Sequence, residues 1–149
     1  MTRDAYIAKT VDKLEKLNYN GICNWCTGVG KTTLGIEAIR KIEKKGKHSF
    51  IVLSPSPEIN KQWENKIKQS FPKHLIERII LKTPQQILGT ETRYIVDMLI
   101  VDELHEFTTD ERLTLIDKTK IKFEYFLGLT ASANKPDFRK ILKFFNIKV

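Results

Sequence analysis

The sequence has few cysteines and histidines and no long apolar run. Its 149 residues include two cysteines and three histidines, and His48, His74 and His105 are scattered without the spacing of a zinc finger. No stretch approaches the roughly 18 apolar residues of a membrane span. The N-terminus alternates charged and apolar residues, whereas a secretory signal needs an unbroken apolar stretch. We therefore expect a cytoplasmic chain that does not cross a membrane.

Proline-rich linkers, internal repeats and low-complexity tracts are also missing. The length suits one domain, and the contents of hydrophobic (41%) and charged residues (30%) are those of a globular protein. Twenty-six basic residues against eighteen acidic ones give a net charge of +8. That charge suits a polyanionic partner, but the lysines are spread along the chain, so a solvated basic surface explains it equally well.

Hydrophobic periodicity predicts strands alternating with helices. Helices are expected at 4–17, at 31–45, from Ser56 and Pro57 onward with Trp63 packed in the core, after a capping box at 108–111, and at 136–145; strands are expected at 21–26, 49–54, 77–82, 97–103 and 123–132. This alternation is typical of an α/β fold with a mostly parallel sheet and helices on both faces. Ligands of such sheets bind at the carboxyl ends of the strands.

Two motifs overlap in the stretch CNWCTGVGKTT. Cys23 and Cys26 have the spacing of a redox or metal pair, but on a strand residues three apart point to opposite faces. Small half-buried thiols in a reducing compartment are the favoured interpretation.

The second motif in this stretch is a phosphate-binding loop between a predicted strand and a predicted helix. Gly28 and Gly30 let backbone N–H groups approach phosphate, and the helix N-terminus adds positive charge. Lys31 would place a cation on the β and γ phosphates, and Thr32 would offer its hydroxyl to Mg²⁺. Trp25 departs from the usual pattern, which has glycine at that position.

An acidic pair, Asp102 and Glu103, ends the apolar strand in LIVDELHEF. Two adjacent carboxylates repel each other unless a cation neutralises them, and nucleotide-bound Mg²⁺ is the natural candidate. We expect Asp102 to hold the metal and Glu103 to orient and deprotonate the attacking water. The alternative is an acidic cap before the next helix.

Together these motifs resemble the superfamily 2 helicases and translocases of the DExH type, specifically the first of their two RecA-like lobes. CTGVGKT resembles motif I, VDELH motif II, GLTAS motif III, SPSPEINKQW motif Ia and ILKTPQQIL motif Ib. The resemblance covers nearly the whole chain and implies a RecA-like P-loop domain that binds ATP and Mg²⁺.

The resemblance also implies the roles of individual residues. Catalysis would fall to Lys31, Asp102, Glu103 and His105, and the metal to Thr32 and Asp102. Nucleotide binding would involve Thr27, Gly28, Val29, Gly30, Lys31, Thr32 and Thr33. Coupling of the nucleotide state to the nucleic acid would use His105, Thr130 and Ser132. The phosphate backbone of one nucleic-acid strand would contact Pro55, Ser56 and Thr83. Ser56 as a helix cap and Thr83 as a turn residue are the alternatives.

Departures from the family pattern shape the functional expectation. The adenine-reading glutamine of many relatives has no clear match, Ala133 stands where a proline is expected, and nothing resembles motifs IV to VI. We therefore expect residues 1–149 to form one lobe without the second, which is slow or inactive alone and needs a partner lobe, another protein or self-association. Nucleic acid, with DNA favoured over RNA, would bind weakly and without sequence preference. A non-enzymatic, nucleotide-dependent binding module is the alternative, and a small-molecule kinase fits less well.

Overall fold

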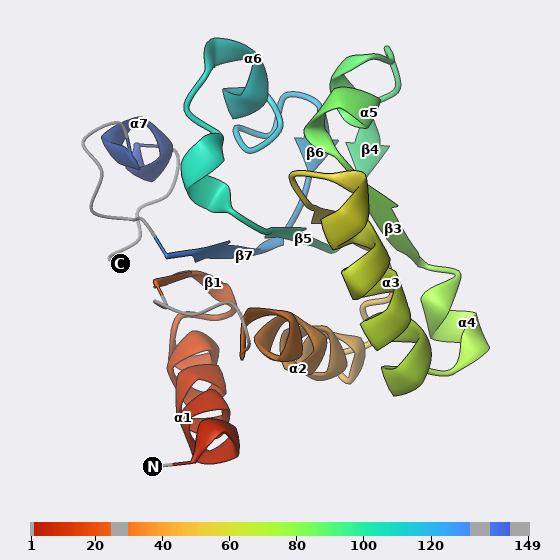
Figure 1. Cartoon of the computed structure of the whole chain (residues 1–149), viewed down its shortest axis with the longest axis vertical. Coiled ribbons are helices and arrows are strands. Elements are labelled where there is room, and N and C mark those ends of the chain that lie inside the picture. The colour runs from red at the N-terminus through yellow and green to blue at the C-terminus, as the bar shows by residue number, and fades with distance from the viewer. Residues whose placement is uncertain (1, 25–29, 132–137, 144–149) are drawn as a thin grey trace.

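Five parallel strands form the central sheet of the computed structural model, which describes residues 2–24, 30–131 and 138–143 (Figure 1). The sheet consists of β1 (Asn20–Asn24), β2 (Phe50–Leu53), β3 (Ile79–Lys82), β5 (Met98–Val101) and β7 (Tyr125–Thr130). Their spatial order is β1-β7-β5-β2-β3. A separate parallel pair is formed by β4 (Tyr94–Ile95) and β6 (Ile121–Lys122).

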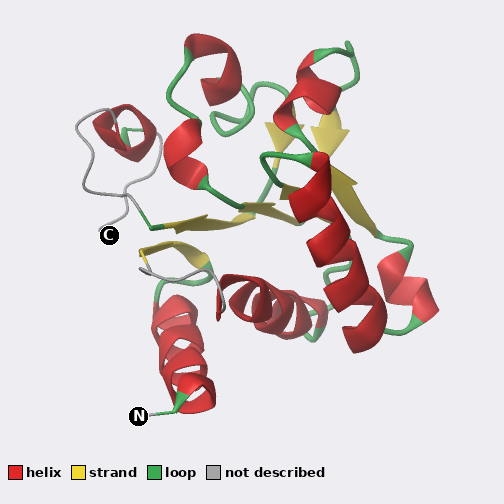
Figure 2. Cartoon of the chain, viewed as in Figure 1, coloured by secondary structure: helices red, strands yellow, loops and turns green. Residues whose placement is uncertain are grey.

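Helices cover both faces of this sheet (Figure 2). They are α1 (Arg3–Lys16), α2 (Lys31–Glu43), α3 (Pro57–Ser70), α4 (Lys73–Ile76), α5 (Pro84–Leu88), α6 (Asp110–Leu113) and α7 (Arg139–Leu142), with a 3₁₀ turn η2 (Leu104–Glu106). In Figure 1, α1 and α2 lie on one side of the sheet, and α6 and α7 lie on the other. No helix in the described ranges is long and apolar enough to span a membrane.

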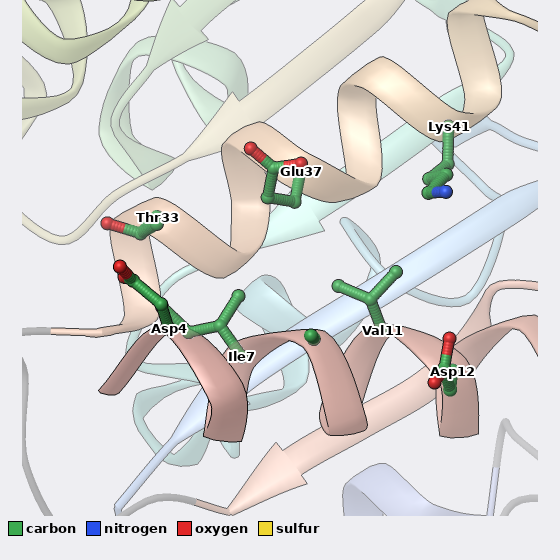
Figure 3. Close-up of a pocket in the computed structure, with 8 residues that line it drawn as sticks. Asp4, Ile7, Val11, Asp12, Thr33, Glu37 and Lys41 are labelled. Atoms are coloured by element: carbon green, nitrogen blue, oxygen red, sulfur yellow. The ribbon is translucent and has the colours of Figure 1, made fainter. Parts of the chain in front are cut away.

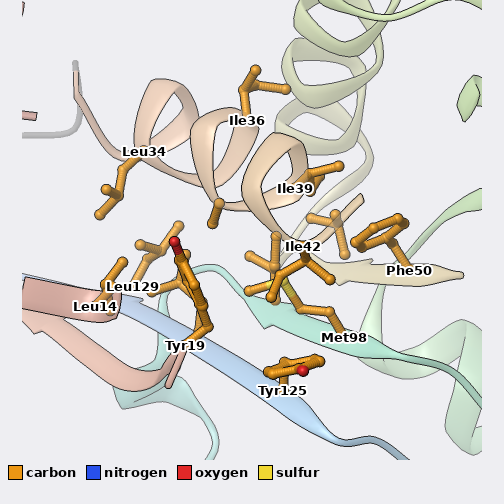
Figure 4. Close-up of a cluster of buried hydrophobic side chains, with 14 of the residues drawn as sticks. Leu14, Tyr19, Leu34, Ile36, Ile39, Ile42, Phe50, Met98, Tyr125 and Leu129 are labelled. Carbon is orange, nitrogen blue, oxygen red and sulfur yellow. The ribbon is translucent and has the colours of Figure 1, made fainter. Parts of the chain in front are cut away.

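Alternate strand residues point into two separate hydrophobic clusters, as the two-residue period of a strand requires. In β5, Met98 and Ile100 face the cluster under α1, α2 and α3, whereas Leu99 and Val101 face the cluster on the other side. Figure 4 shows the first cluster, where apolar side chains of α2 pack against the strands. Because both faces are covered, the central strands β2 and β5 are apolar throughout rather than alternating with polar residues.

The predicted α/β architecture is confirmed, with elements somewhat shorter than expected. The helix predicted at 4–17 buries Ile7, Val11 and Leu14, and the helix predicted at 136–145 buries Phe138 and Ile141 within its described residues. The short elements α4, α5, β4, β6 and η2 were not predicted.

The predicted capping box at 108–111 is wrong. The cap is Thr109, whose hydroxyl accepts a hydrogen bond from the backbone N–H of Arg112. Because the third helical residue is an arginine, it cannot return the bond as Glu or Gln would. A complete capping box occurs instead at Thr83 and Gln86, at the start of α5.

The strand order brings the carboxyl ends of β1, β7 and β5 together. Asn24 pairs with Thr130, and Val101 pairs with Gly128. The residues that follow β1 and β5 therefore emerge at the same edge of the sheet, on either side of β7. Among the described residues that the sequence singled out, Asp102 and Glu103 follow β5 and Thr130 ends β7 at this edge.

Candidate functional site

Lys31 begins α2 at the carboxyl edge of the sheet. Gly30 is the buried N-cap residue of α2, and Lys31 is 5% exposed. The Lys31 ammonium group lies 3.2 Å from the carboxylate Oε1 of Glu103, to which it donates a hydrogen bond. The contact joins the residues following β1 to those following β5, seventy-two positions apart.

The backbone of Glu103 adopts a left-handed conformation, with φ of 55° and ψ of 49°. Such a conformation costs a non-glycine residue about 1–3 kcal/mol, and surrounding contacts must hold it in place. Here Glu103 makes those contacts with its N–H, which donates to Asp102 Oδ1 at 2.9 Å, and with its carboxylate. The sharp turn places two adjacent carboxylates at the end of β5.

Asp102 is a buried carboxylate, 6% exposed. Its backbone N–H donates to the Leu53 carbonyl, and its Oδ2 accepts a 3.0 Å hydrogen bond from Trp63 Nε1. Burial raises the pKa of Asp102 above its ordinary value, and the Glu103 charge adds to this rise; the bond from Trp63 and the Lys31 charge oppose it. The protein's own groups thus only partly offset the cost of burying this carboxylate.

His105 links the acidic pair to β7. Its Nε2 lies 3.3 Å from Glu103 Oε2, and its Nδ1 lies 2.8 Å from the Thr130 hydroxyl. Thr130 is fully buried at the end of β7. The structure thus brings Lys31, Glu103, His105 and Thr130 into one connected series of polar contacts.

Thr32 and Thr33 lie in the first turn of α2, and both are partly exposed. Thr33 faces a pocket of about 350 Å³ between α1 and α2 (Figure 3). The pocket is lined by Asp4, Ile7, Ala8, Val11, Asp12, Thr33, Glu37 and Lys41. Three carboxylates against one ammonium group make this pocket electrostatically unfavourable for a triphosphate.

Pro55 and Ser56 follow β2, and Thr83 follows β3, the neighbouring strand. The predicted cap role is confirmed for Ser56, whose hydroxyl accepts from the Ile59 N–H at 3.3 Å. A hydroxyl that accepts one hydrogen bond keeps its own proton for another acceptor. Thr83 is also a cap residue, bonded to Gln86, and only 6% of it is exposed. Ser56 is therefore better placed than Thr83 to touch a phosphate through its side chain.

Several predicted residues lie outside the described ranges, namely Thr27, Gly28, Val29 and Ser132, together with Cys26. Cys23 is described, and it is buried rather than half-buried as predicted, because it points into the cluster beneath α2. Burial raises the pKa of the Cys23 thiol to about 12, although the Lys31 charge opposes the rise.

The donor set at this edge fits Mg²⁺ bound together with a nucleotide. Mg²⁺ prefers oxygen ligands and usually takes one or two carboxylates plus phosphate oxygens and water. Asp102 would supply the carboxylate and Thr32 the hydroxyl. Within residues 2–24, 30–131 and 138–143, no group of three or more His, Cys, Asp or Glu side chains could hold a metal by itself.

Sequence reasoning missed the contact between Trp63 and Asp102. Trp63 was correctly predicted to pack in the core, and it is fully buried. The available signal was chemical, since a buried indole N–H usually finds an acceptor. The spacing of residues on α3 does not say which acceptor that is.

Comparisons with known proteins agree with this geometry. The model of the family described as "Type III restriction enzyme, res subunit" matches residues 3–135. A Methanocaldococcus jannaschii protein named "Putative ATP-dependent RNA helicase" is 28% identical over 167 residues, which cover 95% of this chain and 21% of that protein.

Two solved structures share the fold. The Pyrococcus furiosus Hef helicase domain matches with a TM-score of 0.74 and 20% identity, over 99% of this chain and 36% of that one. The Sulfolobus solfataricus SWI2/SNF2 ATPase core, solved with double-stranded DNA, matches with a TM-score of 0.73 and 22% identity, over 95% of this chain and 35% of that one. The chain thus spans roughly a third of these structures and about a fifth of the curated relative.

Proposed function

The chain belongs to the family of the type III restriction enzyme res subunit, and on that premise we propose that it binds and hydrolyses ATP as one lobe of a superfamily 2 helicase or translocase. Its RecA-like fold is that of the helicase domain and the ATPase core that it resembles. The chain spans only part of its relatives, so the activity of the whole relatives is a proposal for this chain.

The observation that carries the proposal is the meeting of Lys31 with the acidic pair at one edge of the sheet. Lys31 opens α2, where the helix dipole favours an anion, and its ammonium group lies 3.2 Å from Glu103. Asp102 lies beside them. A phosphate-binding cation next to a metal-binding carboxylate is the minimum needed to hold Mg²⁺ with a nucleoside triphosphate.

Each residue then has a distinct task. Lys31 would bind the β and γ phosphates, and Thr32 with Asp102 would hold Mg²⁺, which neutralises charge developing on the transferred phosphoryl group. Glu103 would orient the attacking water and accept its proton. His105, bonded to both Glu103 and Thr130, would pass changes at the phosphate to β7 and the segment after it.

Nucleic acid is the partner that we propose for the ends of β2 and β3. Pro55 and Ser56 precede α3, whose N-terminal N–H groups favour a phosphate, and Ser56 keeps a hydroxyl proton to donate. Contacts of this kind position a strand without reading its sequence. Binding should therefore be weak, sequence-independent and salt-dependent, with a slope of about 0.7 per phosphate contact on single strands. DNA is favoured over RNA.

A second lobe, supplied by a partner, by another copy or by a longer chain, completes the proposal. An arginine placed across the cleft from the phosphates is worth about 10³–10⁵ in rate. Two described arginines form hydrogen bonds with backbone carbonyls: Arg40 donates to the Ser70 carbonyl, and Arg112 donates to the Glu106 carbonyl. We expect residues 1–149 alone to hydrolyse ATP slowly, and a second RecA-like lobe added in trans to raise the rate.

The test is equilibrium binding of a fluorescent ATP analogue to three variants. Lys31→Ala should abolish measurable binding because it removes the side-chain cation at the phosphates. Glu103→Gln should retain binding and abolish hydrolysis, since it keeps the metal ligand and removes the base. Lys41→Ala is the matched control, because it removes a lysine of the same helix whose side chain lines the pocket between α1 and α2 instead.

Undiminished nucleotide affinity in Lys31→Ala would refute the site assignment. Hydrolysis measured with and without single-stranded and duplex DNA, and with a second lobe in trans, separates an enzyme from a binding module. Nucleotide binding without turnover under all these conditions would favour the non-enzymatic alternative.

A further inference from the structure

Trp63 connects α3 to the carboxylate that we assign to the metal. It lies in the second turn of α3 and is completely buried, and its indole N–H donates a 3.0 Å hydrogen bond to Asp102 Oδ2. The benzene side of the indole lies against Gly35 of α2, so close that a Cβ added at Gly35 would approach the ring Cζ3 to 2.8 Å. The ring therefore fills the space between two helices and the end of β5.

Both oxygens of Asp102 are held by hydrogen bonds. Oδ1 accepts from the Glu103 N–H at 2.9 Å, and Oδ2 accepts from Trp63. The first bond comes from the next residue in the chain, so by itself it fixes the carboxylate only relative to the turn after β5. The second bond comes from a different element and fixes the orientation of the carboxylate relative to α2 and α3.

This arrangement leaves Asp102 able to bind a cation. A carboxylate offers about four lone-pair sites, and the two hydrogen bonds use two of them. Trp63 brings a donor without a charge, so it orients the carboxylate without competing with a cation for the site. A lysine or arginine at the same place would neutralise the carboxylate instead.

We propose that Trp63 is a positioning residue that orients Asp102 toward the metal ion. This proposal rests on the proposed function, because it requires that Asp102 holds Mg²⁺ with the nucleotide. Trp63 itself touches neither nucleotide nor metal and acts through the carboxylate. Partners that orient a metal ligand in this way typically change metal affinity by about 10- to 100-fold when they are removed.

The first variant is Trp63→Phe, which keeps an aromatic ring and removes the N–H. Binding of a fluorescent ATP analogue is measured with EDTA and then across a Mg²⁺ titration. Affinity without Mg²⁺ should stay within about twofold of wild type, because it depends on Lys31. The Mg²⁺ concentration for half-maximal enhancement of binding should rise about 10-fold or more.

A second variant separates the hydrogen bond from the packing. Benzothienylalanine, in which sulfur replaces the indole N–H, is introduced at position 63 and keeps the shape of the bicyclic ring. It should show the same shift in Mg²⁺ dependence as Trp63→Phe. Ile67→Val is the matched control, because Ile67 lies one turn further along α3, is buried in the same cluster and has no bond to Asp102. Its Mg²⁺ dependence should equal that of wild type.

The outcomes distinguish this proposal from the one on which it rests. If wild type binds the analogue with no Mg²⁺ enhancement, the metal assignment itself fails. If wild type shows the enhancement and the benzothienylalanine variant shows an identical Mg²⁺ dependence, Asp102 holds the metal without help from Trp63, and the positioning role is overturned.

Discussion

The replacement Gly35→Ala tests how tightly α2 packs against Trp63. In the interior of a helix, alanine is favoured over glycine by about 0.8–1.0 kcal/mol, so helix propensity alone predicts a more stable protein. The structure predicts the reverse. The added Cβ would lie 2.8 Å from Cζ3 of the indole and still closer to its Cη2, whereas carbon atoms normally pack about 3.5–4.0 Å apart.

Relief of this overlap requires the indole or α2 to move by about 1 Å. The indole is fully buried and bonded to Asp102, so turning it away from Gly35 would disturb its packing and this hydrogen bond. Overpacking of this kind costs about 1–3 kcal/mol, and loss of a hydrogen bond to a charged group costs about 1.5–3 kcal/mol. After the gain in propensity is subtracted, Gly35→Ala should destabilise the protein by roughly 1.5–5 kcal/mol if both costs apply.

Urea unfolding followed by circular dichroism measures this change in the free energy of unfolding. The thermodynamic cycle with Trp63→Phe supplies the control, because phenylalanine lacks the ring atoms that crowd Gly35. Gly35→Ala should cost at least about 1 kcal/mol less in the Trp63→Phe background than in wild type. A Gly35→Ala protein that is more stable than wild type would refute the reasoning.

Three further predictions concern groups outside the nucleotide site. Asp97→Ala should cost about 1–3 kcal/mol in urea unfolding, since Asp97 Oδ2 accepts from the N–H groups of His48 and Ser49. Burial acts to raise the pKa of Asp97, but these hydrogen bonds outweigh it and hold the pKa below 3.8. The stability advantage of wild type over Asp97→Ala should therefore be complete above that pH and shrink as the pH falls below it. A constant difference in stability down to about pH 2 would contradict this. Cys23, with its pKa raised to about 12, should resist iodoacetamide at pH 8 in a folded Cys26→Ser protein and react on unfolding, as mass spectrometry would show; rapid labelling of the folded protein would disprove its burial. Thr83→Ala should cost about 1 kcal/mol in thermal unfolding because it removes the capping box of α5, and an unchanged melting temperature would show that the cap contributes nothing.

The main elements of the fold could be predicted because their sequence signals are strong and local. Apolar strands of four to six residues and amphipathic helices of thirteen or fourteen residues stand out from periodicity alone. The strands β4 and β6 could not be predicted, since they have two residues each and form one short parallel pair. The helix α5 did have a local signal, namely Thr83, Pro84 and Gln86 in the pattern of a capping box, which was missed. The cap at Thr109 was misplaced by one residue because Thr108 and Thr109 have the same chemistry.

The centre of the site could be predicted because one topological rule locates it. Parallel strands bring their carboxyl ends to one edge, so the segment after β1 and the pair Asp102 and Glu103 had to meet there. The details depend on side-chain packing that sequence spacing does not encode. Neither the left-handed backbone of Glu103 nor the bond from Trp63 to Asp102 has a sequence signature.

The most direct measurement for the central claim is the anomalous X-ray signal of Mn²⁺ in crystals grown with Mn²⁺ and a non-hydrolysable ATP analogue. Mn²⁺ takes the same oxygen ligands as Mg²⁺ and can be located without ambiguity. The account predicts one strong peak beside Asp102 and Thr32, with the terminal phosphates against Lys31. A nucleotide bound elsewhere, such as in the pocket between α1 and α2, or a metal peak away from Asp102, would contradict it.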